Sequence, residues 1–478
     1  MEKSPVHLWQ RAMTTKVPIL IPVENQVREF DAKLLLACIA ANRGFSSVIG
    51  SRREMEFRIA SFPRSLYLSK SMTIRSALLF KIAHKVGHNI VAWDEEALVH
   101  LPPETYFADR LSPSSIRYVS HLLAWGQNNA DLWRQYSNLP DGVPIHITGN
   151  PRADMLRPEM RPFFAADVEK IQKSYKNFIL LNTNFNHVNA FSPEMNLFRP
   201  VKKPGETPGF GRGARGMSRE FAEGLRDHKQ AVFQDFQQLI PALERSFPEY
   251  TIIVRPHPTE NQEIYRNIAA QCKRVQVTNE GNVVPWILAS EAVIHNCCTT
   301  GLEAYVMGVP AISYRATVNN FYDLGFYRLP NLLSHQCFDF EELHATLKDI
   351  LAGKLGPADG AERQELVNHH MVGLDGPLAC ERIVDVCERV VDDGFDLHKP
   401  VFRYRLNRFY MEKGLSLINR YKSYLPDEFN KPAFQRHRYP GISIEELRAR
   451  LSRFQNILGY SEELKVEETA DQIFRISE

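Results

Sequence analysis

The feature that most constrains this chain is a repeated order of apolar strand, helix and apolar strand. VPILIPV at 17–23 is rich in β-branched residues, and the helical pattern of Asp31–Asn42 follows it and ends at Arg43-Gly44. The strand-like run SSVIG comes next. A strand–helix–strand unit of this kind builds a parallel sheet with a right-handed crossover. The sequence therefore predicts an α/β fold.

The same order starts again at 177–185, NFILLNTNF. Further strand-like runs are SLYLS (65–69), NIVAW (89–93), HLLAWG (121–126), YTIIVRPHP (250–258), RVQVT (274–278), AVIHN (292–296) and PAISY (310–314). With 478 residues the chain is too long for one core. We predict two doubly wound parallel-sheet domains facing a cleft, at 1–160 and 161–395, and a helical C-terminal extension at 396–478. In such sheets ligands bind beyond the carboxyl ends of the strands.

Charge and composition exclude some classes of function. The 58 Lys and Arg residues nearly balance the 56 Asp and Glu residues, so no global positive field favours nucleic acid as the partner. The seven cysteines contain no C-x-x-C pair, which favours reduced thiols over zinc or redox chemistry. The N-terminal residues lack a signal-peptide pattern, and no apolar run reaches the length of about 18 residues that spans a membrane. We expect a cytoplasmic protein.

Two irregular segments stand out. Residues 186–219 contain Gly211, Gly213 and Gly216 in G-x-G-x-x-G spacing, but no strand precedes them, so we expect a basic, mobile lid in place of a dinucleotide site. Residues 398–440 carry ten Lys or Arg against three Asp or Glu, together with many aromatics. This segment is either a helical tail packed on the body or an attachment, within 402–438, to an anionic inner-membrane surface.

Two segments at strand ends suit a phosphate group. In Arg255-Pro256-His257-Pro258 the prolines stop a strand and leave a guanidinium and an imidazole at its carboxyl end. The alternative is a strand-end turn with a hydrogen-bonded histidine. In the segment 295–304 a strand ends and a helix begins, which exposes unpaired N–H groups beside Thr299, Thr300 and Gly301. There the alternative is that Thr299 merely caps the helix and Glu303 lies in its first turns. Asn182 and Asn184 follow another strand of the same half, so we expect them near the phosphate.

Acidic residues end strands of the first half. Asp94, Glu95 and Glu96 follow an apolar strand, where a carboxylate could take a proton from an acceptor hydroxyl or act as a nucleophile. A solvated loop is the alternative. Glu24, Arg28 and Glu29 follow the first strand, and Arg28 could bind an acidic sugar or an acceptor. The alternative interpretation of Glu24, Arg28 and Glu29 is an exposed first helical turn.

Together, RPHP and the Thr299-Thr300 pair resemble the HP motif and Ser/Thr pair of bacterial glycosyltransferases that use CMP-sugars, including sialyltransferases and Kdo transferases. The whole chain also resembles the bacterial surface carbohydrate biosynthesis family. The segments that carry this resemblance are PVENQVRE (22–29), AWDEEAL (92–98), TGNPRAD (148–154), LLNTNF (180–185), RPHP, CTTGLEA and RYPGIS (438–443).

The resemblance implies a GT-B fold with the donor on the C-terminal domain and the acceptor on the N-terminal one. His257, Thr299 and Thr300 would hold the CMP phosphate and Pro258 would border the nucleotide. Glu280 would bind the ribose hydroxyls, unless it is a solvated loop acid. The acid triplet resembles a D/E-D/E-G element that supplies a catalytic or sugar-binding acid, although Ala97 replaces the glycine and puts its tight turn in doubt.

The resemblance therefore implies a metal-independent glycosyltransferase. It would need no cofactor, because a CMP-activated acidic sugar such as Kdo or another nonulosonate serves as co-substrate, and a surface glycan or glycolipid is the acceptor. An epimerase of sugar nucleotides, a phosphoglycerol-type transferase and a non-catalytic polysaccharide-assembly protein are the alternatives.

Overall fold

The computed structural model describes residues 16–201, 203, 205–323, 328–393, 435–436 and 438–478. The chain forms two compact units, which are described separately. Unit 1 combines segments 1–98, 110–163 and 368–478, and unit 2 combines 99–109 and 164–367. Residues 368–395 were predicted to belong to the second domain, whereas the structure places their described part in unit 1. Residues 402–434, most of the predicted membrane-binding segment, lie outside the described residues.

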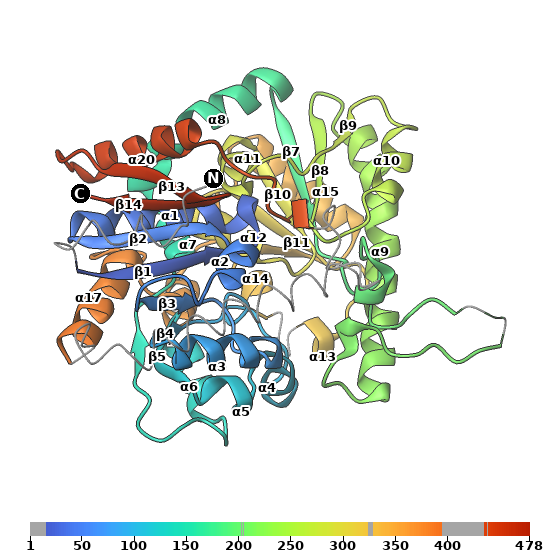
Figure 1. The fold of residues 1–478 in the computed structure, drawn as a ribbon. Helices are drawn as coiled ribbons and strands as arrows, with labels where there is room; N and C mark the ends of the chain where they lie inside the picture. Colours follow the sequence, from blue (N-terminus) through green and yellow to red (C-terminus); the bar gives the residue numbers. More distant parts are fainter. Residues whose placement is uncertain (1–15, 202, 204, 324–327, 394–434, 437) are drawn as a thin grey trace. The chain divides into compact units, whose positions relative to one another are not determined.

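Unit 1 is built on an eight-stranded sheet in the order β13-β14-β2-β1-β3-β4-β5-β6 (Figure 1). The strands are β1 (Lys16–Val23), β2 (Phe45–Ser51), β3 (Leu66–Ser69), β4 (Asn89–Ala92), β5 (Val119–Ala124), β6 (Ile145–Ile147), β13 (Lys465–Ala470) and β14 (Ile473–Ser477). The six strands from β1 to β6 are parallel, and the chain reverses its direction across the sheet between β1 and β3. The predicted parallel sheet is confirmed for this half.

Helices and short 3-10 turns connect these strands. They are α1 (Gln26–Asn42), α2 (Arg52–Phe57), η3 (Ile74–Ser76), α3 (Ala77–Lys85), α5 (Pro113–Ile116), α6 (Gln127–Arg134), α7 (Pro151–Asp154), η4 (Pro158–Met160), α17 (Ala379–Asp392) and α20 (Ile444–Leu458). α1 is buried along almost its whole length because α7, α17 and α20 all contact it. Asp154 accepts the backbone N–H groups of Ala379 at 2.7 Å and Cys380 at 2.8 Å, and so fixes the start of α17.

The C-terminal residues were predicted to be a helical extension. α20 is such a helix, but the chain then forms a β-hairpin, β13-β14, that the sequence analysis did not predict. β14 pairs antiparallel with β2, and Ile473 lies opposite Gly50. A Cβ atom on Gly50 would lie 2.2 Å from the backbone oxygen of Gln472. The hairpin therefore needs a glycine at this point of β2.

Unit 2 has a six-stranded parallel sheet, β9-β8-β7-β10-β11-β12. Its strands are β7 (Phe178–Thr183), β8 (Thr251–Pro256), β9 (Val275–Val277), β10 (Ala292–His295), β11 (Ala311–Tyr314) and β12 (His335–Cys337). Numbered within the unit this order is 3-2-1-4-5-6, the arrangement of dinucleotide-binding Rossmann sheets. The strand order reverses between β7 and β10, so the ligand crevice of unit 2 is expected there.

The helices of unit 2 pack on this sheet and connect its strands. They are α4 (Pro103–Arg110), η5 (Pro193–Met195), η6 (Arg212–Ala214), α9 (Arg219–Ser246), α10 (Glu263–Ala269), α11 (Val283–Ala289), α12 (Thr299–Met307), α13 (Asn320–Asp323), α14 (Arg328–Leu332) and α15 (Phe340–Leu351). α8 (Arg161–Tyr175) and α16 (Ala361–His370) cross the boundaries between the units. Buried Phe236, Ile240 and Leu243 of α9 belong to the main core of unit 2. Among the described residues, no helix combines the length and the apolarity that a bilayer crossing needs.

The predicted lid, residues 186–219, packs around a small apolar cluster of its own. Leu197, Phe198, Ala214 and Met217 are buried there with Tyr322 of α13. A Cβ atom on Gly211 would lie 2.0 Å from the backbone oxygen of Asn196. Close backbone packing therefore explains this glycine, in agreement with the expectation that the G-x-G-x-x-G spacing does not mark a dinucleotide site.

Replacing Gly50 by alanine should destabilise unit 1, because the added methyl group clashes with the hairpin backbone. Overpacking of this kind costs about 1–3 kcal/mol of unfolding free energy. Urea denaturation of wild type and variant measures the difference. The control is Gly356→Ala, where a Cβ meets nothing within 4 Å; it should change stability by less than about 0.5 kcal/mol. Equal stability of the two variants would contradict the assigned contact.

Candidate functional site

Three of the predicted segments meet at the switch point of unit 2. Asn182 at the end of β7 lies in register with Arg255 of β8 on one side and His295 of β10 on the other. Just beyond the strands, the side chain of Asn296 accepts the backbone N–H of Asn184 at 2.8 Å and donates to its carbonyl at 3.3 Å. These two hydrogen bonds fix the loop after β7 to the loop after β10. Asn184 takes part in them through its main chain, not through its side chain.

Two buried polar side chains at this point lack N or O hydrogen-bond partners among the described residues. Asn182 is 2% exposed, and neither its amide oxygen nor its amide nitrogen is bonded. Thr300 is 8% exposed, and its hydroxyl has the weakly bonding thiol of Cys298 as its neighbour. Leaving a buried polar group unsatisfied costs about 1–3 kcal/mol, so such groups in a native fold call for an explanation. A polar ligand in the crevice would satisfy both.

The turn between β10 and α12 places Thr300 in the first turn of a helix. Cys297 adopts a left-handed backbone conformation, with φ of 56°, and Cys298 occupies the N-cap position without a side-chain cap. The alternative that Thr299 is the cap is therefore wrong: the helix begins at Thr299. Because no side chain caps α12, the positive end of its dipole is available to an anion.

Gly301 has a packing role in this turn. His295 is fully buried, donates from Nε2 to the hydroxyl of Ser334 at 2.8 Å, and accepts the N–H of Cys298 on Nδ1 at 3.3 Å. Burial lowers the pKa of His295 to about 3, so the ring is neutral. A Cβ on Gly301 would lie 2.3 Å from Nε2 of this ring. Packing against the His295 ring thus requires glycine at this position. Glu303 is buried on the same helix.

Thr259 fixes the orientation of the His257 ring at the end of β8. Its Nδ1 accepts the N–H of Thr259 at 3.3 Å and lies 2.7 Å from the Thr259 hydroxyl. A neutral ring whose Nδ1 accepts carries its proton on Nε2. The prediction of a histidine suited to a phosphate oxygen is compatible with this geometry, and Pro258 follows directly at the strand end.

Glu260, which the sequence analysis missed, organises the loop around His257. It is 1% exposed and accepts the backbone N–H of His257 at 3.0 Å, the hydroxyl of Thr183 at 3.0 Å and that of Tyr265 at 2.6 Å. Burial raises the pKa of its carboxyl. The buried carboxylate therefore ties β7 to the loop after β8. The one signal in the sequence was an acid two positions after the second proline of RPHP.

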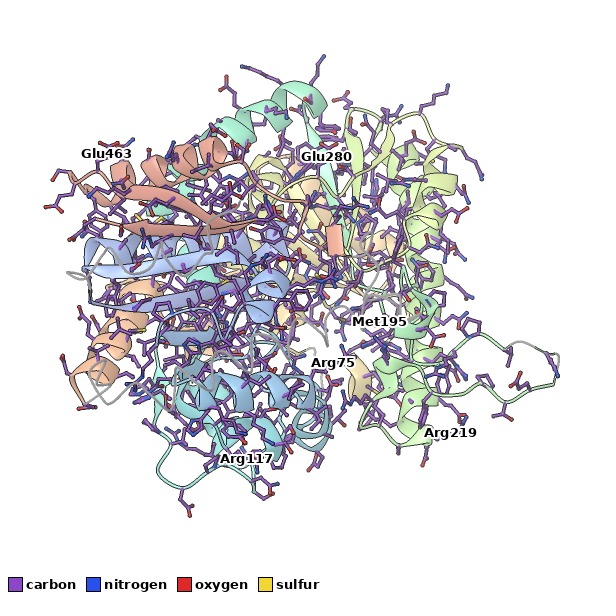
Figure 2. All side chains as sticks on the ribbon, viewed as in Figure 1. Arg75, Arg117, Met195, Arg219, Glu280 and Glu463 are labelled. Carbon is purple, nitrogen blue, oxygen red and sulfur yellow. The ribbon has the colours of Figure 1, made fainter. Side chains whose placement is uncertain are left out.

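Arg255 supports the next loop. Its guanidinium donates to the backbone carbonyls of Glu280, at 2.8 Å, and Gly281, and it lies over the ring of Trp286. Burial lowers the pKa of Arg255 to about 9. The Glu280 side chain itself is exposed, and it is labelled in Figure 2. Contact of Arg255 with a phosphate stays a prediction; the observed bonds make it a residue that positions the Glu280 loop.

Buried basic groups that the sequence analysis did not select surround the same region. Lys229 of α9 is 3% exposed. Burial, together with the nearby charges of Lys229 and His257, lowers the pKa of His187 to about 4, so this ring is neutral. Arg315 and His228 both contact buried Asp323, at 3.5 and 2.7 Å. The region therefore holds the buried cations Lys229 and Arg315, with the carboxylate of Asp323 close to both. A lysine within the apolar face of a long helix was the available signal for Lys229.

The switch point of unit 1, between β1 and β3, holds a network of ion pairs. Glu29 is 2% exposed and pairs with Lys33 at 2.7 Å and with Lys70. Burial raises the pKa of its carboxyl, but the two ammonium groups lower it more, to well below the usual range. Glu29 also accepts the backbone N–H of Glu24 at 3.1 Å. Glu29 is therefore a structural anion of the unit, and the alternative of an exposed helical turn does not apply to it.

Glu24 lies at the more open side of this network. It pairs with Lys70 at 2.9 Å, Arg52 at 3.1 Å and Arg438 at 2.6 Å. Burial raises its pKa, but these cations bring it well below the usual value. Arg438 belongs to RYPGIS, whose Gly441 exchanges two 2.9 Å hydrogen bonds with the side chain of Gln26. Two segments far apart in the sequence thus meet at the start of α1.

The three acids of the 94–96 triplet have different surroundings. Asp94 is fully buried, forms an ion pair with Arg110, and accepts the indole N–H of Trp125 on its backbone oxygen at 2.9 Å. Glu96 is 47% exposed in its side chain and pairs with Arg28 at 2.9 Å. Partial burial opposes ionisation of Glu96, but Arg28 and Arg110 lower its pKa to about 2.

Glu95 combines burial with an unused oxygen. It is 4% exposed; its Oε1 accepts the indole N–H of Trp93 at 2.9 Å and lies 3.8 Å from Nζ of Lys33, while Oε2 has no hydrogen-bond partner. The backbone N–H of Ala97 donates to the carbonyl of Asp94 at 3.3 Å. Alanine is therefore compatible with the tight turn, and the doubt raised by the missing glycine is removed.

Comparisons with solved structures show the fold. A variant of the wall teichoic acid polymerase TagF with CDPG aligns with a TM-score of 0.50 and 11% identity, over 82% of this chain and 93% of that chain. UDP-GlcNAc 2-epimerase from Neisseria meningitidis, bound to UDP-GlcNAc, gives a TM-score of 0.46 and 12% identity, over 78% of this chain and all of that chain. No family model and no curated protein matches the sequence. The chain has the GT-B fold, with two Rossmann-like units.

Replacing Thr300 by valine should reduce anion binding in unit 2 without a loss of stability. Valine has the same shape, and among the described residues the hydroxyl that it removes has only the weakly bonding thiol of Cys298 as a partner. Thr183→Val is the matched change, because its hydroxyl donates to buried Glu260 and its loss should cost about 1–3 kcal/mol of unfolding free energy. Urea denaturation and CMP titration by calorimetry separate the two effects. A Thr300→Val protein that is destabilised but binds CMP normally would show that the hydroxyl is structural.

Proposed function

We propose that this chain is a glycosyltransferase that transfers an acidic sugar, such as Kdo or another nonulosonate, from CMP to a surface polysaccharide or glycolipid. The observation that carries the proposal is the buried amide of Asn182, which has no hydrogen-bond partner among the described residues, next to the buried Thr300 hydroxyl at the Rossmann switch point of unit 2. They stand where nucleotides bind in sheets of this order. The resemblance of RPHP and Thr299-Thr300 to CMP-sugar transferases supports the choice of nucleotide.

In this proposal unit 2 binds the donor. The CMP phosphate lies at the start of α12, where the hydroxyls of Thr299 and Thr300 donate to its oxygens and the imidazole of His257 lies on the same side of the crevice. The same groups stabilise the negative charge that develops on departing CMP, and preorganised donors of this kind are worth several kcal/mol in a transition state. Arg255 holds the loop from which Glu280 reaches the ribose hydroxyls. No metal ion is assigned a role.

In the proposed reaction, unit 1 binds the acceptor and provides the catalytic base. Glu95 is assigned as the catalytic carboxylate, because its Oε2 is unpartnered while Trp93 and Lys33 orient Oε1. Asp94 is already committed to Arg110. Arg28 and Glu96 form the more exposed pair and are assigned, with Glu24, to the acceptor or the sugar. The base accepts the proton of the attacking hydroxyl as the bond from the sugar to CMP breaks.

The buried ammonium group of Lys229, which acts on both His187 and Asp323, supports an anionic donor. An acidic sugar on CMP carries its carboxylate beside the phosphate. A CDP-linked alcohol carries two phosphates, so a phosphoglycerol-type transferase is the second candidate, and the fold likeness to TagF favours it. Both reactions release CMP. An epimerase of sugar nucleotides would instead return a nucleotide sugar.

Thermal unfolding with CMP, CDP, UDP, GDP and TDP tests the nucleotide. CMP should stabilise most, because a ligand present at about 100 times its dissociation constant adds about 2.7 kcal/mol. Incubation with CMP-Kdo or CDP-glycerol and an acceptor extract then distinguishes the two transferases by the donor from which CMP is released. Preferential stabilisation by UDP would overturn the cytidine assignment and favour the epimerase. Binding of CMP without turnover of either donor would favour the non-catalytic assembly protein.

Converting Glu95 to glutamine should remove transfer and leave CMP binding intact. Loss of a general base costs typically about 10²–10⁴-fold in rate. Asp94→Asn should instead lower thermal stability, because it leaves Arg110 without its buried partner. Glu96→Gln should have a smaller effect on rate, mainly through acceptor affinity. Normal turnover by the Glu95 variant would exclude it as the base, and the search would move to Glu24.

A further inference from the structure

The segment that surrounds α3 in unit 1 contains basic residues and no acidic ones. Between Glu56 and Asp94 the sequence has six Lys or Arg residues and no Asp or Glu. In a chain whose basic and acidic residues nearly balance, this is a local concentration of positive charge. Three of these basic residues, Arg75, Lys81 and Lys85, lie on η3 and α3 and are exposed.

The exposed side of η3 and α3 is also apolar. Ile74 is 45% exposed and Leu78 is 51% exposed, whereas Phe80 and Ile82 of the same helix are buried in unit 1. Ile74, Leu78, Lys81 and Lys85 are spaced by four, three and four residues, so they lie along one stripe of a helix. None of the ion pairs among the described residues involves Lys81 or Lys85, so neither charge is neutralised locally.

Arg117 and Tyr118, which directly follow α5, extend this surface. The ring of Tyr118 lies 5.4 Å from that of His84, and the guanidinium of exposed Arg117 lies 4.9 Å from the Tyr118 ring centroid. Arg75 and Arg117 are labelled in Figure 2. We call the set Ile74, Arg75, Leu78, Lys81, Lys85, Arg117 and Tyr118 the α3 surface. It combines aliphatic side chains, cations and a tyrosine.

We propose that the α3 surface docks unit 1 on an anionic lipid bilayer. Aliphatic side chains flanked by lysine and arginine, with a tyrosine at the edge, are the composition of interfacial helices that insert between lipid headgroups. The cores of protein interfaces are depleted of lysine, and nucleic acid offers nothing to exposed Ile74 and Leu78, so the surface fits lipid better than either. This inference does not depend on the proposed function.

Co-sedimentation of the full chain with vesicles tests the docking surface. Wild type should bind vesicles that contain phosphatidylglycerol, bind vesicles of phosphatidylcholine alone much more weakly, and be released by salt. The double variant Lys81→Ser, Lys85→Ser should bind about 25-fold more weakly, because each basic side chain near such a surface contributes about 1 kcal/mol, or about fivefold. Ile74→Ser with Leu78→Ser should also weaken binding, with little change in its salt dependence.

The matched control is Phe338→Ser with Lys348→Ser, which removes one exposed apolar and one exposed basic side chain from unit 2. It should bind vesicles like wild type, and thermal unfolding verifies that every variant is folded. The basic segment 398–440 is present in all of these proteins, so binding through that segment alone would leave all variants equal and would overturn the proposal. Absence of wild-type binding would overturn it too. The proposal would also be overturned if the protein bound duplex DNA and this binding required Lys81 and Lys85 but not Ile74 and Leu78. The surface would then be assigned to nucleic acid.

Discussion

Unit 1 depends on the buried carboxylate of Glu29. It receives the ammonium groups of Lys33, from the same helix, and of Lys70, from the loop after β3, and thereby joins α1 to the next strand of the sheet. Removing one member of a buried ion pair typically costs about 3–5 kcal/mol, because the remaining charge is left uncompensated. The positions of Glu24 and Glu95 follow from the same two lysines, since each has one of them as a neighbour.

The two switch points are built in opposite ways. In unit 1, acids and bases largely satisfy one another, and Oε2 of Glu95 is left without a partner. In unit 2, the buried amide of Asn182 has no hydrogen-bond partner among the described residues, while the nearby acid Glu260 is satisfied by the Thr183 and Tyr265 hydroxyls and a backbone N–H. Under the function we propose, the acceptor hydroxyl would lose its proton in the first environment and the nucleotide phosphate would lie in the second.

Much of this arrangement could be predicted from the sequence. The apolar strands and their intervening helices predict two parallel sheets, and the strand ends predict where polar residues such as Asn182, His257 and Thr300 gather. The roles of Arg255 and Gly301 could not be predicted, because they depend on the Glu280 loop and the His295 ring, which are brought near by the tertiary fold. Glu260 and Lys229 were missed for the same reason: burial makes them important, and a single sequence does not reveal the burial of an isolated charge. The β13-β14 hairpin was missed because its partner strand lies more than four hundred residues earlier.

The position of that hairpin has a consequence for the order in which the chain can fold on the ribosome. Apart from the short piece 99–109, unit 2 is one continuous stretch, so all its strands have emerged while the last part of unit 1 is still being synthesised. Strand β2 meanwhile remains an open sheet edge, and open edges pair readily with other chains. Nascent chains would thus be most prone to aggregation in the interval before residues 465–477 are synthesised. By then unit 2, with its Rossmann strand order, is already complete.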